Sequence, residues 1–185
     1  MRFEKHYKLE GVHAPFSPSQ SSWLNYDDDK ALEVFNNKKA AEMGTKLHHW
    51  AKETIDLGIK QPRSKKTLYA YVNDAIGFQM ETEVVLYYSD YFYGTADAIS
   101  FRDGILRIHD LKTGKTQVKR EQVMIYAALF CLEYKVDPKD IHIECRIYQN
   151  DDVDIFEPTV ENIVSIINKI VHFNKLLERY EGGLS

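Results

Sequence analysis

The sequence has 185 residues, of which 44% are hydrophobic and 28% are charged, a profile typical of one globular domain with one sizeable core. It has no run of about 18 apolar residues, which excludes a membrane-spanning helix, and its first residues lack the apolar core of a signal peptide. The net charge of −4 argues only weakly against nucleic-acid binding, because affinity for phosphate comes from local patches. Cys131 and Cys145 lie in apolar stretches, as expected for reduced core residues of a cytoplasmic protein.

The beginning of the chain is predicted to be irregular and then helical. Residues 1–29 are rich in serine and proline, which favours an irregular segment that either belongs to the domain or forms a mobile arm. Asp27-Asp28-Asp29 is expected to cap the next helix, since the spacing of these acids does not suit a calcium site. Apolar residues at helical spacing then predict a helix over residues 30–57, with a break near Asn36-Asn37 and an end at Gly58.

Two histidines stand side by side in this predicted helix. His48 lies one helical turn after Gly44, and a glycine at that distance allows another backbone or a metal-bearing strand to approach closely. A lone helix histidine is most often a surface residue or a satisfied core residue. His49 is chemically identical, so the helix by itself does not decide which histidine, if either, has a function.

The next stretch combines basic and aromatic residues. Residues 61–67 form a predicted loop before a helix over residues 65–77, and its cations either solvate the helix start or contact phosphates. Alternation then predicts strands over Glu83–Ser89 and Tyr91–Phe101. The aromatic residues near their junction either stack on bases of single-stranded DNA or, as we favour for most of them, pack in the core. The cations are Arg63, Lys65 and Lys66, and the aromatic residues are Tyr87, Tyr88, Tyr91, Phe92 and Tyr93.

Acidic residues lie near the polar ends of two β-patterned runs that meet at Asp103-Gly104, a dipeptide suited to a tight hairpin turn. Asp110 and Lys112 are two residues apart on a strand and project to one face, with Asp97 of the neighbouring strand beside them. Aspartates at strand ends are usually turn or capping residues, but Asp110 lies beside Leu111 inside a β-rich run, where an unpartnered carboxylate is costly. Such a group makes sense if a divalent cation lies between the carboxylates and the lysine faces an anionic substrate or a reacting water.

The remaining elements complete a single α/β domain over residues 1–185, with a mixed central sheet and helices on both sides. A helix that follows Gly114 is expected to begin with a phosphate-binding patch of Lys115, Lys119 and Arg120, aided by the helix N-terminus. The predicted ranges are helix 114–134, strand 140–149, a short edge strand over 153–156 and a last helix over 158–181.

Four short motifs, in this order along the chain, resemble those of the PD-(D/E)XK nuclease superfamily, and most closely its RecB-like branch. They span Gly44 to Tyr126, and each is weak alone. The resemblance implies a restriction-endonuclease-like core. The motifs are Gly44-Thr45-Lys46-Leu47-His48, Gly94-x-x-Asp97, Asp110-x-Lys112-Thr113 and Gln122-x-x-x-Tyr126.

The resemblance implies hydrolysis of phosphodiester bonds in DNA with bound Mg²⁺ or Mn²⁺, and an imidazole ligand makes Mn²⁺ a strong competitor. Its spacing selects His48 rather than His49. Lys112 is expected to orient or help deprotonate the attacking water, or to contact the phosphate. No iron–sulfur cluster is expected, because two cysteines cannot supply the four that some relatives use. The implied metal ligands are His48, Asp97, Asp110 and the backbone carbonyl of Leu111; Lys112, Gln122 and Tyr126 line the site, and Glu83 supports it.

The expected activity is that of an exonuclease acting on DNA ends or single strands in replication, recombination or repair. The alternatives are a non-catalytic nucleic-acid-binding accessory subunit and a structure-specific or restriction-type endonuclease. The chain carries no Gly-rich P-loop, so a helicase or recombination motor would be a separate partner, and a homo-oligomer is also possible in this branch. A bacterial or phage origin, a cytoplasmic location and no membrane association are expected.

Overall fold

The computed structural model describes Tyr7, residues 14–114 and residues 119–183. The chain divides into two compact units, Met1–Thr45 and Lys46–Ser185. The first contains the 3₁₀ helix η2 (Ser21–Asn25) and the beginning of helix α1 (Asp28–Asp56). The second contains the rest of α1, a five-stranded sheet and the other α-helices.

Helix α1 starts as the sequence predicts and then differs from the prediction. The Asp27 carboxylate accepts a hydrogen bond from the Lys30 N–H at 2.8 Å, which confirms the acidic cap. The predicted break near Asn36-Asn37 was wrong, because the helix runs without interruption. Each asparagine costs only a few tenths of a kcal/mol in a helix, and the alanine, lysine and glutamate residues around them are good helix formers.

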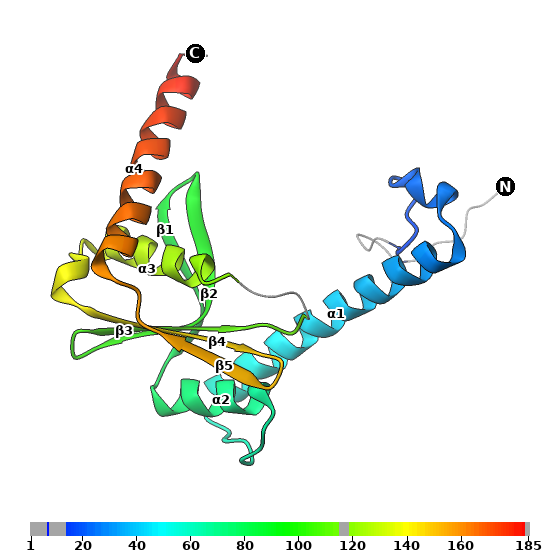
Figure 1. Ribbon diagram of the computed structural model, residues 1–185, viewed down its shortest axis with the longest axis horizontal. Helices are drawn as coiled ribbons and strands as arrows, with labels where there is room; N and C mark the ends of the chain where they lie inside the picture. Colours follow the sequence, from blue (N-terminus) through cyan, green and yellow to red (C-terminus); the bar gives the residue numbers. More distant parts are fainter. Residues whose placement is uncertain (1–6, 8–13, 115–118, 184–185) are drawn as a thin grey trace. The chain divides into compact units, whose positions relative to one another are not determined.

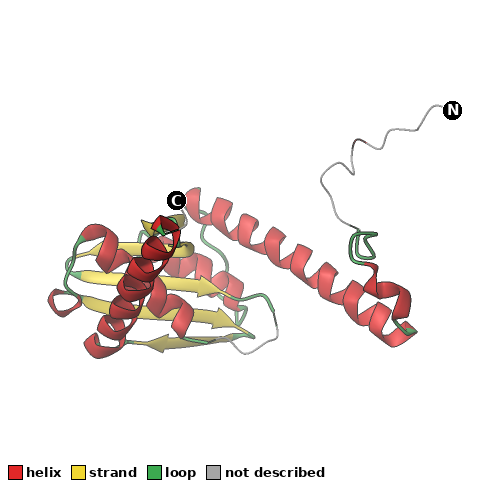
Figure 2. Cartoon of the chain, turned by 90° about the horizontal axis from the view of Figure 1, so that it is seen from above, coloured by secondary structure: helices red, strands yellow, loops and turns green. Residues whose placement is uncertain are grey.

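The sheet is mixed, as predicted, and its strands follow chain order from β1 to β5. All neighbouring strands are antiparallel except β3 and β4, which are parallel and joined through α3, since parallel strands need a crossover connection. Figure 2 shows the strands side by side. The strands are β1 (Glu81–Ser89), β2 (Phe92–Arg102), β3 (Ile105–Leu111), β4 (His142–Gln149) and β5 (Asp152–Phe156).

Helices cover both faces of the sheet in the second unit (Figure 1). Helices α3 (Glu121–Tyr134) and α4 (Val160–Gly182) pack on one face over a core that includes Ile108 and Ile147. Helix α2 (Thr67–Gly77) and the last turns of α1 cover the other face, where Leu111 and Tyr148 are buried. The α/β class with a mixed sheet is therefore confirmed.

The turn between β2 and β3 has the predicted geometry. Asp103 and Gly104 have φ values of 52° and 75°, and Arg102 pairs with Ile105 across the two-residue loop. Positive φ at both central residues matches the right-handed twist of the flanking strands. The turn therefore sets the register that brings the end of β3 beside the middle of β2.

Helix α3 begins later than predicted, at Glu121 rather than near Gly114. Arg120 occupies its N-cap, and Lys119 precedes it in non-helical chain. Residues 115–118, and with them the predicted phosphate contact Lys115, lie outside the described residues. The predicted start of this helix was thus seven residues, about two helical turns, too early, whereas Lys119 and Arg120 still lie directly before the helix.

Both cysteines are buried free thiols. Burial raises the pKa of Cys131 to about 11 and that of Cys145 to about 12, so both stay protonated near neutral pH and are poor nucleophiles. Among the described helices, none is long and apolar enough to cross a membrane.

The α2 face of the sheet encloses a neutral histidine. His109 is fully buried on β3, and its Nδ1 lies 3.2 Å from the Tyr148 hydroxyl. Burial, followed by the charges of Arg146 and Arg107, lowers the pKa of His109 from 6.5 to about 3. The Tyr148 hydroxyl donates to Asp74 of α2 at 2.7 Å, so this polar chain ties α2 to the sheet.

The neutral state of His109 predicts a pH-dependent stability. The unfolded chain protonates this side chain below pH 6.5, so its contribution is complete above that pH and is lost progressively as pH falls towards 3. Between about pH 7.5 and 5 the loss is about 2 kcal/mol. The variant His109→Gln keeps a neutral hydrogen-bonding group and is expected to lack this loss. Urea denaturation of both proteins in EDTA at the two pH values measures it, and equal pH dependence would contradict it.

Candidate functional site

The end of β3 carries a buried carboxylate with its own cation. Asp110 is 1% exposed, and both of its carboxylate oxygens lie 2.9 Å from the Lys112 Nζ. Only Oδ1 has hydrogen-bond geometry to this ammonium, so Oδ2 is buried beside a charge and has no donor among the described residues. The Lys112 N–H donates to the Tyr148 carbonyl at 2.9 Å, which fixes the backbone that carries the lysine. The predicted convergence of Asp110 and Lys112 is thus present.

Asp97 lies beside this pair on β2. Ala98 pairs with His109, which brings Asp97 opposite Asp110 at the end of the ladder. The Asp97 carboxylate accepts the Leu111 N–H at 2.8 Å, and its Oδ2 lies 3.6 Å from Nδ1 of His48. Burial, and then the charge of Asp110, raise the pKa of Asp97. A carboxylate whose charge is disfavoured in this way gains from a cation placed next to it.

Glu83 lies with Asp97 and His48 in one cluster. The sequence predicted Asp97 and His48 as metal ligands but gave Glu83 only a supporting role. Thr82 pairs with Ala98 and Val84 pairs with Ala96, which leaves Glu83 opposite Asp97. Ligand atoms of His48, Glu83 and Asp97 all lie within 4.8 Å of one another. Glu83, expected to have only a supporting role, thus belongs to the closest group of three, whereas Asp110 lies next to that group with Lys112.

The backbone is strained at Glu83. Its φ is 52°, an uncommon value for a residue with a side chain, which costs about 1–3 kcal/mol and persists where surrounding structure imposes it. Ala96 packs in the cluster under α3, whereas Ala98 packs in the cluster under α2. Residues two apart on a strand normally share a face, so the pleat is interrupted at the level of Glu83 and Asp97.

The donor set fits a divalent cation. Carboxylate oxygens with one imidazole nitrogen suit Mn²⁺ well and Mg²⁺ less well. The Oδ2 of Asp110, buried without a donor, is a further oxygen whose lone pairs a cation would satisfy. The Leu111 carbonyl stays a predicted ligand, because the described contact of Leu111 is the N–H that it donates to Asp97.

Two predicted residues of α3 hold the lysine from the other side. The Gln122 Oε1 accepts a hydrogen bond from the Lys112 Nζ at 2.8 Å, and its Nε2 donates to the Tyr126 hydroxyl at 3.2 Å. A Cβ on Gly94 would lie 3.0 Å from Cε1 of Tyr126, closer than ordinary van der Waals contact. The glycine of the Gly-x-x-Asp motif therefore makes room for the tyrosine that positions Gln122 and, through it, Lys112.

A second network joins α1 to β1 next to Glu83. The Lys52 ammonium pairs with the Asp56 carboxylate and lies 3.3 Å from the Thr82 hydroxyl. That hydroxyl donates to the Asp56 Oδ1 at 2.7 Å. Since Lys52 is one helical turn after His48 and Thr82 precedes Glu83, these bonds fix the helix that carries the histidine relative to the strand that carries the glutamate.

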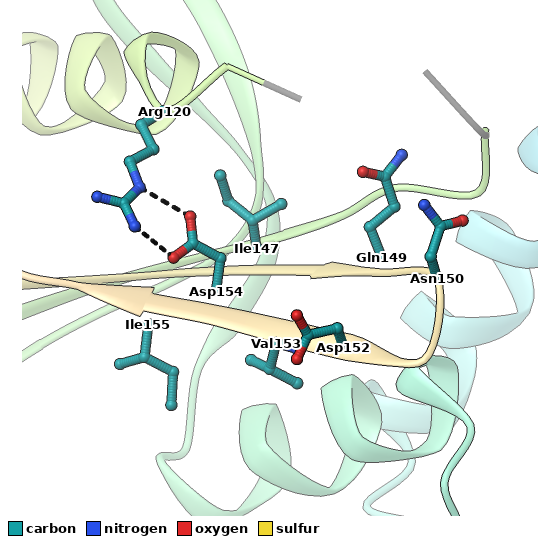
Figure 3. A pocket seen from close by; sticks show the side chains of 8 residues that line it. All are labelled: Arg120, Ile147, Gln149, Asn150, Asp152, Val153, Asp154 and Ile155. Atoms are coloured by element: carbon teal, nitrogen blue, oxygen red, sulfur yellow. Dashed lines mark hydrogen bonds and ion pairs between the residues drawn. The ribbon is translucent and has the colours of Figure 1, made fainter. Parts of the chain in front are cut away.

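The predicted DNA-binding cations differ in their surroundings. Lys65 and Lys66 are exposed before α2, and the Lys66 Nζ lies 5.3 Å from the centre of the Tyr69 ring. Lys119 is exposed. Arg120 lies above the β4–β5 hairpin, at the edge of a hollow of about 840 Å³, and makes two hydrogen bonds to Asp154 (Figure 3). A phosphate would have to compete with this carboxylate for Arg120.

Comparisons with protein-family models, with curated proteins and with solved structures found no match. The geometry itself defines the site: carboxylate and imidazole groups lie where the pleat of β1 and β2 is interrupted, next to a lysine paired with a buried aspartate.

Two features of this site were missed in the sequence. Glu83 received only a supporting role, because nothing local shows that it lies opposite Asp97. The network of Lys52, Asp56 and Thr82 was also missed. The sequence shows only that Lys52 and Asp56 follow His48 at intervals of four residues. Residues at this spacing share one face of a helix.

Proposed function

We propose that this protein is a metal-dependent nuclease that hydrolyses phosphodiester bonds in DNA, with the PD-(D/E)XK arrangement of the RecB-like branch. The observation that carries the proposal is the convergence of Asp97, Asp110 and Lys112, from two strands, with His48 of α1. A role in binding alone would not require a buried carboxylate, a paired ammonium and an imidazole at one point. The order of the four motifs along the sequence also supports a nuclease of this kind.

In this proposal His48, Glu83 and Asp97 hold the cation, and Asp110 adds its oxygen that lacks a donor. Bound Mg²⁺ or Mn²⁺ lowers the pKa of a coordinated water and polarises the phosphate. The carboxylates of Glu83 and Asp97 bring negative charge that the cation compensates, so the anionic substrate is not repelled once the metal is bound.

Lys112 has the most defined role among the side chains. Within the described part of the chain, Asp110 and Gln122 use two of its three N–H groups. The third is left to donate to a phosphate oxygen or to orient the attacking water. Asp110 and Gln122 hold the ammonium in place, so its positive charge is already positioned before the reaction starts. Such preorganisation is the condition for effective transition-state stabilisation.

A cleavage assay with Mn²⁺, Mg²⁺ or EDTA tests the proposal on linear duplex, single-stranded and covalently closed circular DNA. Loss of linear DNA alone, dependent on metal, is the expected result and assigns an exonuclease acting on ends or single strands. Cutting of circles would assign an endonuclease instead. Absence of cleavage in every metal, with DNA still bound, would overturn the nuclease and favour a non-catalytic binding subunit.

A further inference from the structure

The β1–β2 hairpin extends beyond the rest of the sheet, and among the residues that the structure describes one of its faces is exposed. β3 pairs only with residues 98–102 of β2, so the part of the hairpin nearer its tip is a two-stranded arm (Figure 1). The inner face of this arm packs against α3 through Leu86 and Ala96, and the Glu133 carboxylate accepts the Tyr87 N–H at 2.8 Å. The arm is therefore anchored on one side and exposed on the other.

The outer face of the arm carries apolar side chains where polar ones are usual. Val85, Tyr87 and Tyr93 are 55%, 45% and 63% exposed. Antiparallel sheets with one solvated face normally place polar residues on it. Tyr87 and Tyr93 form a cross-strand pair whose ring centres lie 6.4 Å apart at 29°, and the Tyr87 hydroxyl donates to Asp90 at 2.8 Å. Two rings are thus held in a defined orientation and face water.

This aromatic pair lies in line with the carboxylates of the candidate site. Successive positions on the outer face are Glu83 opposite Asp97, then Val85 paired with Thr95, then Tyr87 paired with Tyr93. Four residues separate Glu83 from Tyr87 along β1, a distance of about 13 Å at about 3.3 Å per residue. The rings therefore stand at the end of a straight row of side chains that starts at the metal ligands.

We propose that the outer face of the β1–β2 arm binds single-stranded DNA next to the cleavage site, with one or two bases stacked on Tyr87 and Tyr93. The inference rests on the proposed function, because the two tyrosines lie next to a cleavage site only if Glu83 and Asp97 hold the catalytic metal. It adds the surface on which a single strand lies and the two side chains that contact its bases.

The charges of this face support stacking rather than attraction of phosphates. The charged residues of the row are the acids Glu83 and Asp97, and a third acid, Asp90 in the turn, accepts from the Tyr87 hydroxyl, so the arm itself gains little from the DNA backbone. Aromatic side chains stack on any unpaired base, whereas the bases of a duplex hide their faces inside the helix. The arm is therefore expected to prefer single strands without reading their sequence.

The test compares binding of a fluorescently labelled oligo(dT) and of a labelled blunt duplex by anisotropy in Ca²⁺, which compensates the carboxylates of the site, and gels confirm that neither DNA is cut. The variant Tyr87→Leu/Tyr93→Leu keeps an apolar cross-strand pair but removes both rings. Its affinity for oligo(dT) is expected to fall about 5- to 100-fold, with duplex binding unchanged. Tyr87→Phe/Tyr93→Phe, which keeps the rings, is expected to bind like the wild type. Tyr180→Leu on α4, where the tyrosine is 67% exposed, is the matched control.

The dependence on salt separates stacking from a lost phosphate contact. The slope of log affinity against log salt is expected to be the same in the wild type and the leucine variant, since no charge is removed. Unchanged oligo(dT) binding by the leucine variant would overturn the inference, as would a wild type that binds only duplex or no DNA. Cleavage is measured separately with Mn²⁺, so a failure of the arm and a failure of the nuclease give different results.

Discussion

The variant Lys112→Met is expected to cleave linear DNA at least about 100-fold more slowly than the wild type. Methionine has nearly the length of the lysine stem but cannot donate to a phosphate oxygen or to a water. The ammonium that it replaces is held at 2.9 Å by Asp110 and at 2.8 Å by Gln122, so no other group takes over its position. Initial rates with saturating Mn²⁺ measure the effect.

Two controls separate lost chemistry from lost structure. Lys175→Met removes an exposed lysine from α4 and is expected to cleave within about twofold of the wild type. Lys112→Met also leaves the Asp110 carboxylate without its cation, which is expected to lower the free energy of unfolding by about 1–3 kcal/mol. Asp110→Asn/Lys112→Met removes that buried charge and should regain much of the loss in urea denaturation. A folded Lys112→Met protein with more than a tenth of wild-type activity would refute the role of Lys112.

Binding of Mn²⁺ is expected to stabilise the folded protein by about 2.7 kcal/mol at a free concentration of 100 times its Kd. The physical reason is that His48, Glu83 and Asp97 place their ligand atoms within 4.8 Å of one another only in the folded state. In His48→Gln, a 100-fold loss of affinity would reduce the gain at that concentration to about 0.4 kcal/mol. Urea denaturation with Mn²⁺ and with EDTA gives both values.

The neighbouring histidine provides the matched control. His49 has a 69% exposed side chain and lies 3.5 Å from Glu53 rather than beside Asp97. His49→Gln is therefore expected to keep the full gain in stability on addition of Mn²⁺. If both histidine variants respond to Mn²⁺ as the wild type does, the cluster around Asp97 is not the metal site.

Local patterns in the sequence predicted the elements and part of the site. The alternation around Asp103-Gly104 predicted the hairpin correctly, because a two-residue turn of this kind needs positive φ at both positions. The period of two along a strand placed Asp110 and Lys112 together. The helix break at Asn36-Asn37 and the early start of α3 were wrong, since weak propensities do not set where helices break or begin.

The sequence by itself determined which residues are present to act, their order along the chain and which of them share a strand or a helix. Only the tertiary structure decided that Glu83 lies opposite Asp97 and that Tyr87 and Tyr93 are exposed instead of buried in the core. The physical reason is that strand register and the packing of α1 and α3 on the sheet depend on contacts between residues far apart in the chain. No local periodicity encodes these contacts.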